Sequence, residues 1–175
     1  MKAKNKAIRA LSREEIRDLF QNTGDKAFRG NQVYEWLWSK GAHHFDDMTN
    51  ISKETRELLS EHFVINHIEV DSIQKSNDGT IKNAVKLFDG LIVESVLIPT
   101  PSRTTACVSS QVGCSLDCKF CATSRLKKMR NLNPDEIYDQ VKAIDQESRL
   151  YHSRPLSNIV FMGMGEPLMN YNNLL

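Results

Sequence analysis

The sequence predicts an α/β protein in which a small N-terminal helical domain precedes a short antiparallel β segment and the start of a series of β/α units. Apolar residues recur at helical spacing as far as residue 66 and then alternate with a period of two as far as residue 100. From residue 101 onward, buried strands alternate with a helix. We therefore divide the chain into residues 1–66, 67–100 and 101–175.

The helices of the first domain carry recognisable start and stop signals. Ser12 and Glu15 have the spacing of a capping box and precede an apolar helical face. A second helix is predicted over residues 32–40, with Gly41 as its C-cap. Ser52 is expected to cap the N-terminus of a third helix. These signals predict a three-helix module.

Two tight turns define the β segment. Asn77-Asp78-Gly79 is a strong hairpin signal, and Asp89-Gly90 predicts a second turn between strands over residues 81–88 and 91–98. Pro99 then marks the expected boundary of this segment.

Glu94 is a candidate base in the last of these strands. A period of two places it on one face with Ile92, Val96 and Ile98. Desolvation on an apolar face raises the pKa of a carboxyl group and suits it to proton transfer. A solvated glutamate on an edge strand is the alternative interpretation.

The third segment predicts two parallel strands joined by a helix. Residues 104–109 and 158–162 are short apolar runs, and Asn133, Pro134 and Glu136 give an N-cap, a proline at the first position and an acidic third position. The helix is expected to reach about residue 149. The carboxyl ends of parallel strands share one edge of a sheet, where ligands bind in such folds.

Three cysteines follow the first of these strands. Cys114, Cys118 and Cys121 form a C-x3-C-x2-C pattern, and such a short loop is expected to bring their sulfurs together. Thiolates bind zinc, Cu(I) or iron–sulfur clusters. A structural zinc site takes four protein ligands, whereas a [4Fe–4S] cluster with three thiolates keeps one iron open. A zinc site and a disulfide framework are the alternatives to the cluster.

Composition excludes several classes of protein. The 175 residues carry a net charge of +1, so the chain has no polybasic character overall. No apolar stretch approaches the roughly eighteen residues of a membrane span. The charged N-terminal residues contain no apolar leader segment, which argues against secretion and disulfides. A cytoplasmic location is expected.

The combined motifs resemble the radical S-adenosylmethionine (SAM) enzymes, and among them the RlmN family of adenine-C2 RNA methyltransferases. The resemblance extends from about Leu11 to the last residue. The motifs that carry it are Phe28–Val33, Phe45–Asn50, Cys107–Cys114, Cys118–Thr123 and Gly163–Pro167.

The resemblance implies a partial, TIM-like radical SAM barrel with a [4Fe–4S] cluster and SAM as cofactors. It implies methylation of adenine C2 in 23S rRNA and in tRNA, an electron donor such as flavodoxin, and a full protein that is monomeric. A family member would continue for about as long again, and residues 170–175 have the pattern of a further helix that begins there.

The resemblance also assigns roles to individual residues. Cys114, Cys118 and Cys121 would bind the cluster. Gly163 and Gly165 would let SAM approach the main chain, because they lack side chains. The remaining motif residues are Glu166, which would accept a hydrogen bond from the SAM ammonium group, and Pro167, which would fix the turn.

Cys107 and Glu94 complete the implied catalytic set. In the family, a C-terminal cysteine is methylated by one SAM, and a 5′-deoxyadenosyl radical from another SAM activates that methyl group. The Cys107 equivalent then pairs transiently with the methyl-carrying cysteine, which does not occur in these 175 residues. The Glu94 equivalent is the proton acceptor. As given, this stretch of chain is not expected to turn over.

A cluster of basic residues follows the cysteines: Arg125, Lys127, Lys128 and Arg130. Next to a catalytic edge they would suit RNA phosphates, although such a run is often only a solvated face. Two other functions stay open. One is the related C8-adenine rRNA methyltransferase of antibiotic resistance, and the other is a non-catalytic RNA-binding or iron–sulfur module.

Overall fold

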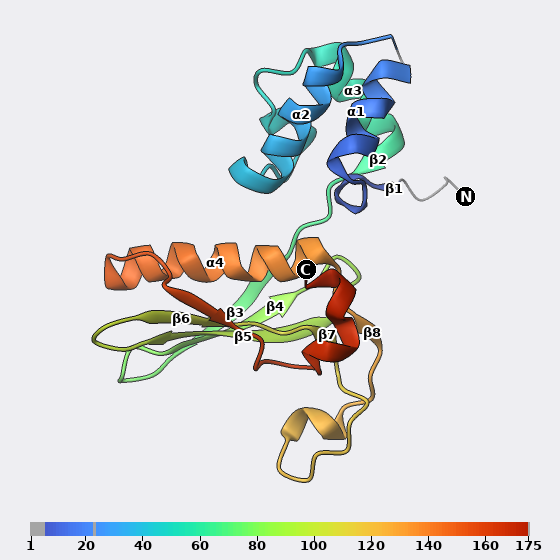
Figure 1. The fold of residues 1–175 in the computed structure, drawn as a ribbon. Helices are drawn as coiled ribbons and strands as arrows, with labels where there is room; N and C mark the ends of the chain where they lie inside the picture. The colour runs from blue at the N-terminus through green and yellow to red at the C-terminus, as the bar shows by residue number, and fades with distance from the viewer. Residues whose placement is uncertain (1–5, 23, 175) are drawn as a thin grey trace. The chain divides into compact units, whose positions relative to one another are not determined.

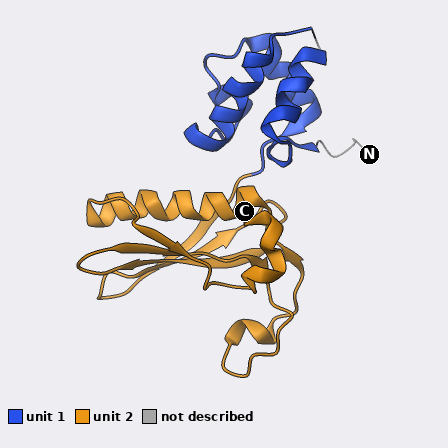
Figure 2. Ribbon diagram, in the orientation of Figure 1, with its two compact units in different colours: residues 1–66 blue, residues 67–175 orange. Residues whose placement is uncertain are grey.

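The computed structural model describes residues 6–22 and 24–174, which form two compact units divided at residues 66 and 67 (Figure 2). This division coincides with the first expected boundary. The expectation that no leader segment is present falls mainly on residues 1–5, outside the described residues, as does the last residue of the helix expected over residues 170–175. Among the described residues, no helix is both long and apolar enough to cross a bilayer.

Residues 6–66 form a helical unit around one apolar core. A parallel pair of two-residue strands, β1 (Lys6–Ala7) and β2 (Phe63–Val64), joins its two ends. The helices are α1 (Arg13–Asn22), α2 (Ala27–Glu35) and α3 (Lys53–His62), together with the short elements η1 (Ile8–Ala10), η2 (Trp36–Lys40) and η3 (Phe45–Asp47).

The predicted caps of this unit are confirmed. The Glu15 amide donates to Ser12 Oγ at 3.1 Å, and the Ser12 amide donates to Glu15 Oε2 at 2.7 Å. Gly41 ends η2 with φ +72°, a conformation that costs glycine little. Ser52 Oγ accepts from the Thr55 amide at the start of α3. The helix predicted over residues 32–40 begins earlier, at Ala27.

The early start of α2 has a packing cause at Gly30. A Cβ atom there would lie 2.7 Å from Arg17 Cα, so glycine allows α2 to cross closely over α1. Glycine is a weak helix former in isolation, which is why propensity does not reveal this turn of helix. The free energy that stabilises this turn comes from burial of apolar side chains, since Ile16, Val33 and Leu37 in the same core are at most 1% exposed.

Residues 67–174 are built on a mixed five-stranded sheet with the order β3-β4-β5-β6-β9 (Figure 1). The first four strands are antiparallel, and β9 is parallel to β6. Both predicted turns are confirmed by positive φ at Gly79 and Gly90. The strands are β3 (Glu69–Lys75), β4 (Ile81–Lys86), β5 (Ile92–Pro99), β6 (Thr104–Cys107) and β9 (Asn158–Val160).

The expected division between residues 100 and 101 lies inside this sheet. β5 and β6 pair from Val96 opposite Cys107 to Pro99 opposite Thr104, so the two flanking segments share one unit. Pro99 is the last residue of its strand, a place where a missing amide donor is tolerated. The proline therefore ends a strand and does not separate two domains.

Helix α4 (Pro134–His152) lies along one face of the sheet (Figure 1). The predicted N-cap at Asn133 and the acidic third position at Glu136 are confirmed, and together they form a capping box. Two buried clusters fill the space beneath it, with Ile137 and Ile144 facing residues of β4, β5 and β6. The other face of β5 carries Ile92 at 49% exposed and Ile98 at 37% exposed.

One buried carboxylate under α4 gives a pH-dependent prediction. Glu147 is 9% exposed and accepts a hydrogen bond from Asn83 Nδ2 at 2.8 Å, while Asn83 Oδ1 has no partner among the described residues. Burial raises the pKa of Glu147, against the opposing effects of Asn83 and Lys75. The folded state therefore binds this proton more tightly than the unfolded chain does.

We expect Glu147→Gln to stabilise residues 67–175 by about 1 kcal/mol at neutral pH, because a glutamine amide can serve both Asn83 atoms. The stability that the raised pKa confers on the wild type is complete below pH 4.5 and is lost as pH rises through the folded-state value. Urea unfolding from pH 4 to 8 should show a gain that grows with pH. A constant difference between the two proteins would contradict this account.

Candidate cluster and cofactor site

The predicted site residues gather where β6 and β9 end. After β6 the chain forms β7 (Gln111–Val112), a loop over residues 113–129 and β8 (Arg130–Asn131). We call residues 113–129 the cysteine loop and the antiparallel pair β7–β8 its stem. Residues 163–166, the glycine turn, follow β9, and Cys107 lies opposite Val160 in the parallel pair. The cysteine loop and the glycine turn are thus at the same edge of the sheet, as predicted.

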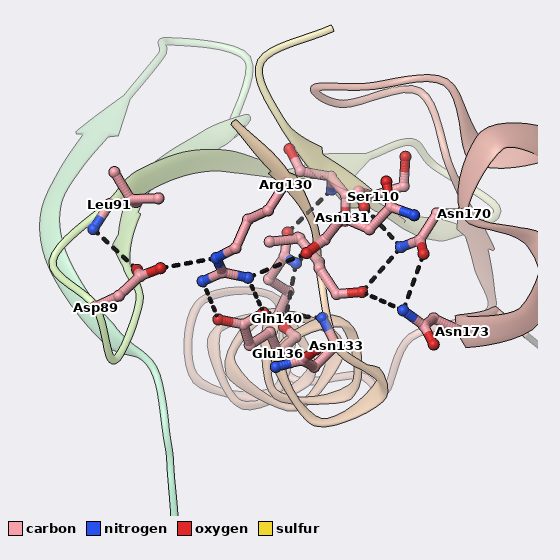
Figure 3. Close-up of polar contacts among 12 residues, drawn as sticks. Asp89, Leu91, Ser110, Arg130, Asn131, Asn133, Glu136, Gln140, Asn170 and Asn173 are labelled. Atoms are coloured by element: carbon pink, nitrogen blue, oxygen red, sulfur yellow. Dashed lines mark hydrogen bonds and ion pairs between the residues drawn. The ribbon is translucent and has the colours of Figure 1, made fainter. Parts of the chain in front are cut away.

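An ion-pair network holds the stem (Figure 3). The Arg130 guanidinium donates two bonds of 2.7 Å to the Glu136 carboxylate, whose side chain is 3% exposed, and one of 2.7 Å to Asp89. The Glu136 partner raises the pKa of Arg130 further, and the Arg130 hydrogen bond holds the pKa of Asp89 below its usual value. Glu136 also accepts from the Asn133 amide at the start of α4.

This network corrects part of the basic-cluster prediction. Arg130 serves the protein interior, because it joins the stem to α4 through a bidentate pair with Glu136 and to the β4–β5 turn through a single bond to Asp89. Arg125 and Lys127 are exposed and Lys128 is partly buried, so these three side chains stay candidates for phosphate contact. The sequence shows only a run of four cations and does not show that one of them has internal partners.

The three loop cysteines are separate, partly buried thiols. None of the four cysteines of the chain forms a disulfide. The amides of Ser124 and Thr123 lower the pKa of Cys121 by hydrogen bonding, and the Leu116 amide approaches Cys114 Sγ at 3.5 Å. Amides that donate to sulfur favour the thiolate, which is the form that binds metals.

The expected convergence of the three sulfurs is not present. Within residues 6–22 and 24–174, no three His, Cys, Asp or Glu side chains are arranged to hold a metal ion. The spacing brings the three cysteines into one loop, but it does not by itself fix where their side chains point. The donor set of three thiols in one short loop fits an iron–sulfur cluster by its chemistry.

The glycine turn packs against the segment that follows β6. A Cβ at Gly163 would lie 2.7 Å from Ser109 Oγ, and one at Gly165 would lie 2.5 Å from Gln111 Cβ. Gly165 also has φ +94°. Both positions therefore require glycine for the contact between two parts of this chain. The predicted approach of SAM is a separate role, which these contacts do not test.

Glu166 and Pro167 begin the short helix η5 (Pro167–Asn173). Glu166 Oε1 accepts from the Leu168 amide at 3.1 Å, so this carboxylate caps η5, and Pro167 occupies its first turn. Proline is well suited to that position because its fixed φ matches a helix start. A hydrogen bond from Glu166 to the SAM ammonium group stays a prediction.

Cys107 and Glu94 lie on the same face of the sheet, away from α4. Cys107 is paired with Val96 of β5, and Glu94 lies two residues before Val96 in the same strand, so all three share one face. Cys107 is 8% exposed, and burial raises the pKa of its thiol although the Met162 amide donates to the sulfur. The desolvated setting expected for Glu94 is wrong for this structure: its side chain is 52% exposed and pairs with Lys82 at 3.1 Å.

Several residues at the site were not singled out from the sequence. The side chains of Ser109 and Gln111, both fully buried, bond to amides of the glycine turn, and Asn131 and Asn170 hold the stem and η5. Ser109 and Gln111 lie within the Cys107–Cys114 motif, but a polar residue in a motif carries no signal of its partner. Only the paired geometry reveals their role.

A cysteine loop and a glycine turn at the ends of parallel strands define the radical SAM class, and residues 108–175 match the family model described as the radical SAM superfamily. Residues 7–65 match the model described as the ribosomal RNA large subunit methyltransferase N-terminal domain. A crystal structure of a radical SAM methyltransferase from Sphaerobacter thermophilus superposes with a TM-score of 0.82 and 36% identity, over 97% of this chain and 50% of that chain.

Curated sequences narrow the class further. The chain is 74% identical to a probable dual-specificity RNA methyltransferase RlmN of Flavobacterium johnsoniae and 75% identical to that of Christiangramia forsetii. Each match covers 100% of this chain and 50% of the relative, so the chain spans about half the length of these curated relatives. The chain belongs to the RlmN family of radical SAM RNA methyltransferases. Membership implies a [4Fe–4S] cluster and SAM as cofactors.

Proposed function

We propose that the protein that contains this chain methylates C2 of adenine in 23S rRNA and in tRNA. The observation that carries the proposal is the shared sheet edge of the cysteine loop, the glycine turn and Cys107, in a chain whose relatives are named dual-specificity RNA methyltransferases. The proposal includes a monomeric, cytoplasmic enzyme that receives electrons from a donor such as flavodoxin.

Cys114, Cys118 and Cys121 would hold the cluster, and the glycine turn with Glu166 would bind SAM. When bound, these cofactors supply the one-electron chemistry that activates a methyl group. The second carboxylate oxygen of Glu166, Oε2, suits a cationic amine, because Oε1 is the atom that caps η5. Arg125, Lys127 and Lys128 would contact RNA phosphates beside this edge.

Cys107 and Glu94 would act on the reaction product from the same sheet face. In the proposed route the Cys107 thiolate bonds to the sulfur of the methyl-carrying cysteine. The bond from that sulfur to the product carbon breaks, and its electron pair stays on the carbon, which takes a proton to become the methyl group. Burial raises the pKa of Cys107, so the thiol holds its proton until a base removes it. Glu94 would accept the proton lost from adenine C2, and its ion pair with Lys82 orients the carboxylate.

Nucleoside analysis tests the proposed reaction. A strain that lacks the gene is complemented with the full-length protein, and its rRNA and tRNA are digested and analysed by mass spectrometry. Restored 2-methyladenosine in both RNAs is the expected result. Restored 8-methyladenosine would show that the enzyme methylates C8 of adenine and not C2. Unchanged nucleosides would indicate a non-catalytic RNA-binding or iron–sulfur module.

A second measurement tests the cluster ligands. Anaerobically reconstituted protein is expected to bind about four iron atoms per chain, in keeping with a [4Fe–4S] cluster. Cys114→Ala, Cys118→Ala and Cys121→Ala should each lose most of the iron, because only three thiolates are available in the loop. Cys107→Ala is the matched control and should retain it. Equal loss in the control would mean a four-thiolate cluster with no open iron.

A further inference from the structure

We propose that Ser109 and Gln111 are positioning residues that fix the glycine turn against the stem of the cysteine loop. Through them, the two halves of the cofactor site move as one piece. This inference rests on the proposed function, because it concerns how the SAM-binding turn is held relative to the cluster ligands. It assigns a task to two fully buried side chains.

Ser109 connects the turn to the neighbouring strand. Its hydroxyl accepts from the Met164 amide at 2.8 Å and donates to the Glu94 carbonyl at 2.6 Å. Gly163 brings the turn this close, since its missing Cβ would overlap the hydroxyl. Gln140 of α4 fixes the Ser109 backbone by accepting from its amide at 2.9 Å and donating to its carbonyl at 3.2 Å. The serine therefore cannot move without breaking four bonds to three elements.

Gln111 connects the turn to the stem. Its Oε1 accepts from the Glu166 amide at 3.0 Å, and its Nε2 donates to Asn131 Oδ1 at 2.8 Å. Asn131 in turn donates to the Met169 carbonyl in η5 at 3.1 Å. The backbone follows the same path, because the Gln111 amide donates to the Met164 carbonyl at 3.2 Å. One side chain thus joins the residue expected to meet the SAM amine to the strand that closes the cysteine loop.

A second pair of amides holds η5 to the same segment (Figure 3). Asn170, which is 3% exposed, donates to the carbonyls of Ser110 and Leu132 at 2.8 and 2.9 Å. Asn173 donates to the Leu132 carbonyl as well, at 2.8 Å. The glycine turn is therefore held at its start by Ser109, at its end by Gln111, and beyond its end by Asn170.

The bonding pattern favours positioning over general stabilisation. Ser109 and Gln111 are both 0% exposed, and each uses its acceptor on an amide of the glycine turn, at positions 164 and 166. Loss of either acceptor leaves a partly buried amide without its protein partner, which favours a shift of the turn. Such a shift changes the orientation of Glu166 relative to the cysteine loop, while the pairing between the strands of the sheet is kept.

Two variants of the full-length protein test the inference. Ser109→Ala removes the hydroxyl that accepts from the Met164 amide and donates to the Glu94 carbonyl, and Gln111→Met keeps the volume but removes both polar atoms. Each is expected to raise the SAM dissociation constant of the reconstituted protein about tenfold, the factor that corresponds to one buried hydrogen bond. Ser148→Ala is the control, since Ser148 is equally buried and loses one bond of 2.7 Å at the far end of α4. It should lower stability without weakening SAM binding.

Amide hydrogen exchange provides a readout that does not depend on cofactor binding. The Met164 amide should exchange faster in Ser109→Ala, and the Glu166 amide in Gln111→Met, with neither accelerated in Ser148→Ala. Unchanged exchange and unchanged SAM affinity in both variants would overturn the inference. If the wild type bound no SAM while the two variants still showed these local exchange changes, the proposed function alone would be overturned. The positioning role would then stand.

Discussion

Replacing Arg130 with methionine is expected to lower the free energy of unfolding of residues 67–175 by about 3 kcal/mol, since it leaves a buried carboxylate without its partner. Glu136 is only 2% exposed and receives both arms of the guanidinium, so its charge loses its main compensation. Asp89 loses its ion pair as well. Urea unfolding monitored by circular dichroism measures the change.

Arg149→Met is the matched control for this prediction. Arg149 pairs with Asp145 at 2.8 Å, but its side chain is 60% exposed, so its loss should cost less than about 1 kcal/mol. The double variant Arg130→Met/Glu136→Gln should recover part of the loss, because it removes the uncompensated charge. Equal effects of the two single arginine variants would show that the Arg130 network contributes no more than a surface pair.

Gly165→Ala is expected to destabilise the same unit by about 3 kcal/mol, for two separate reasons. The φ of +94° is unfavourable for any residue with a Cβ. That Cβ would also lie 2.5 Å from Gln111 Cβ, and overpacking of a tight contact costs about 1–3 kcal/mol. Because Gln111 is the residue displaced, binding of SAM should weaken together with stability.

Two other glycines separate these contributions. Gly90 has φ +82°, and no atom lies within 4 Å of the position that a Cβ would take, so Gly90→Ala reports conformational strain alone, about 1 kcal/mol. Gly163 has no positive φ, but its Cβ would lie 2.7 Å from Ser109 Oγ, so Gly163→Ala reports the steric contact alone. If Gly165→Ala were no worse than Gly90→Ala, the contact with Gln111 would have to relax at little cost.

Features set by neighbouring residues were predictable from the sequence. Ser12 with Glu15 and Asn133 with Glu136 satisfy helix amides within one turn, so their spacing alone specifies the caps. The turns at Gly79 and Gly90 depend in the same way on local backbone preference. The α/β class and the shared edge of the cysteine loop and glycine turn followed from the order of these elements.

Features set by distant partners were not predictable. A period of two placed Glu94 correctly on a face with Ile92 and Ile98, but it could not show that α4 covers the opposite face. The four-cation run could not show that Arg130 has partners at positions 89 and 136. Both errors concern which surface is covered, a property of the packed chain.

The site itself shows the same limit. The cysteine spacing predicted three candidate ligands of the right chemistry in one loop, but it did not show how their side chains are arranged there. The glycines were recognised for their missing side chains, although their neighbours in this structure are Ser109 and Gln111. Those two residues were visible in the sequence only as ordinary polar members of a motif.

The mixed pairing of the sheet has a consequence for the order in which the site forms. Strands β3 to β6 pair with neighbours along the chain through short turns, whereas β9 reaches β6 only after the whole of the cysteine loop and α4. Contacts between distant residues form later, because a long loop must close first. The cysteine loop is therefore attached to a folded strand before the glycine turn arrives, and cluster insertion can begin on a half-assembled sheet. Pairing of β9 with β6 then brings the glycine turn to the cysteine loop.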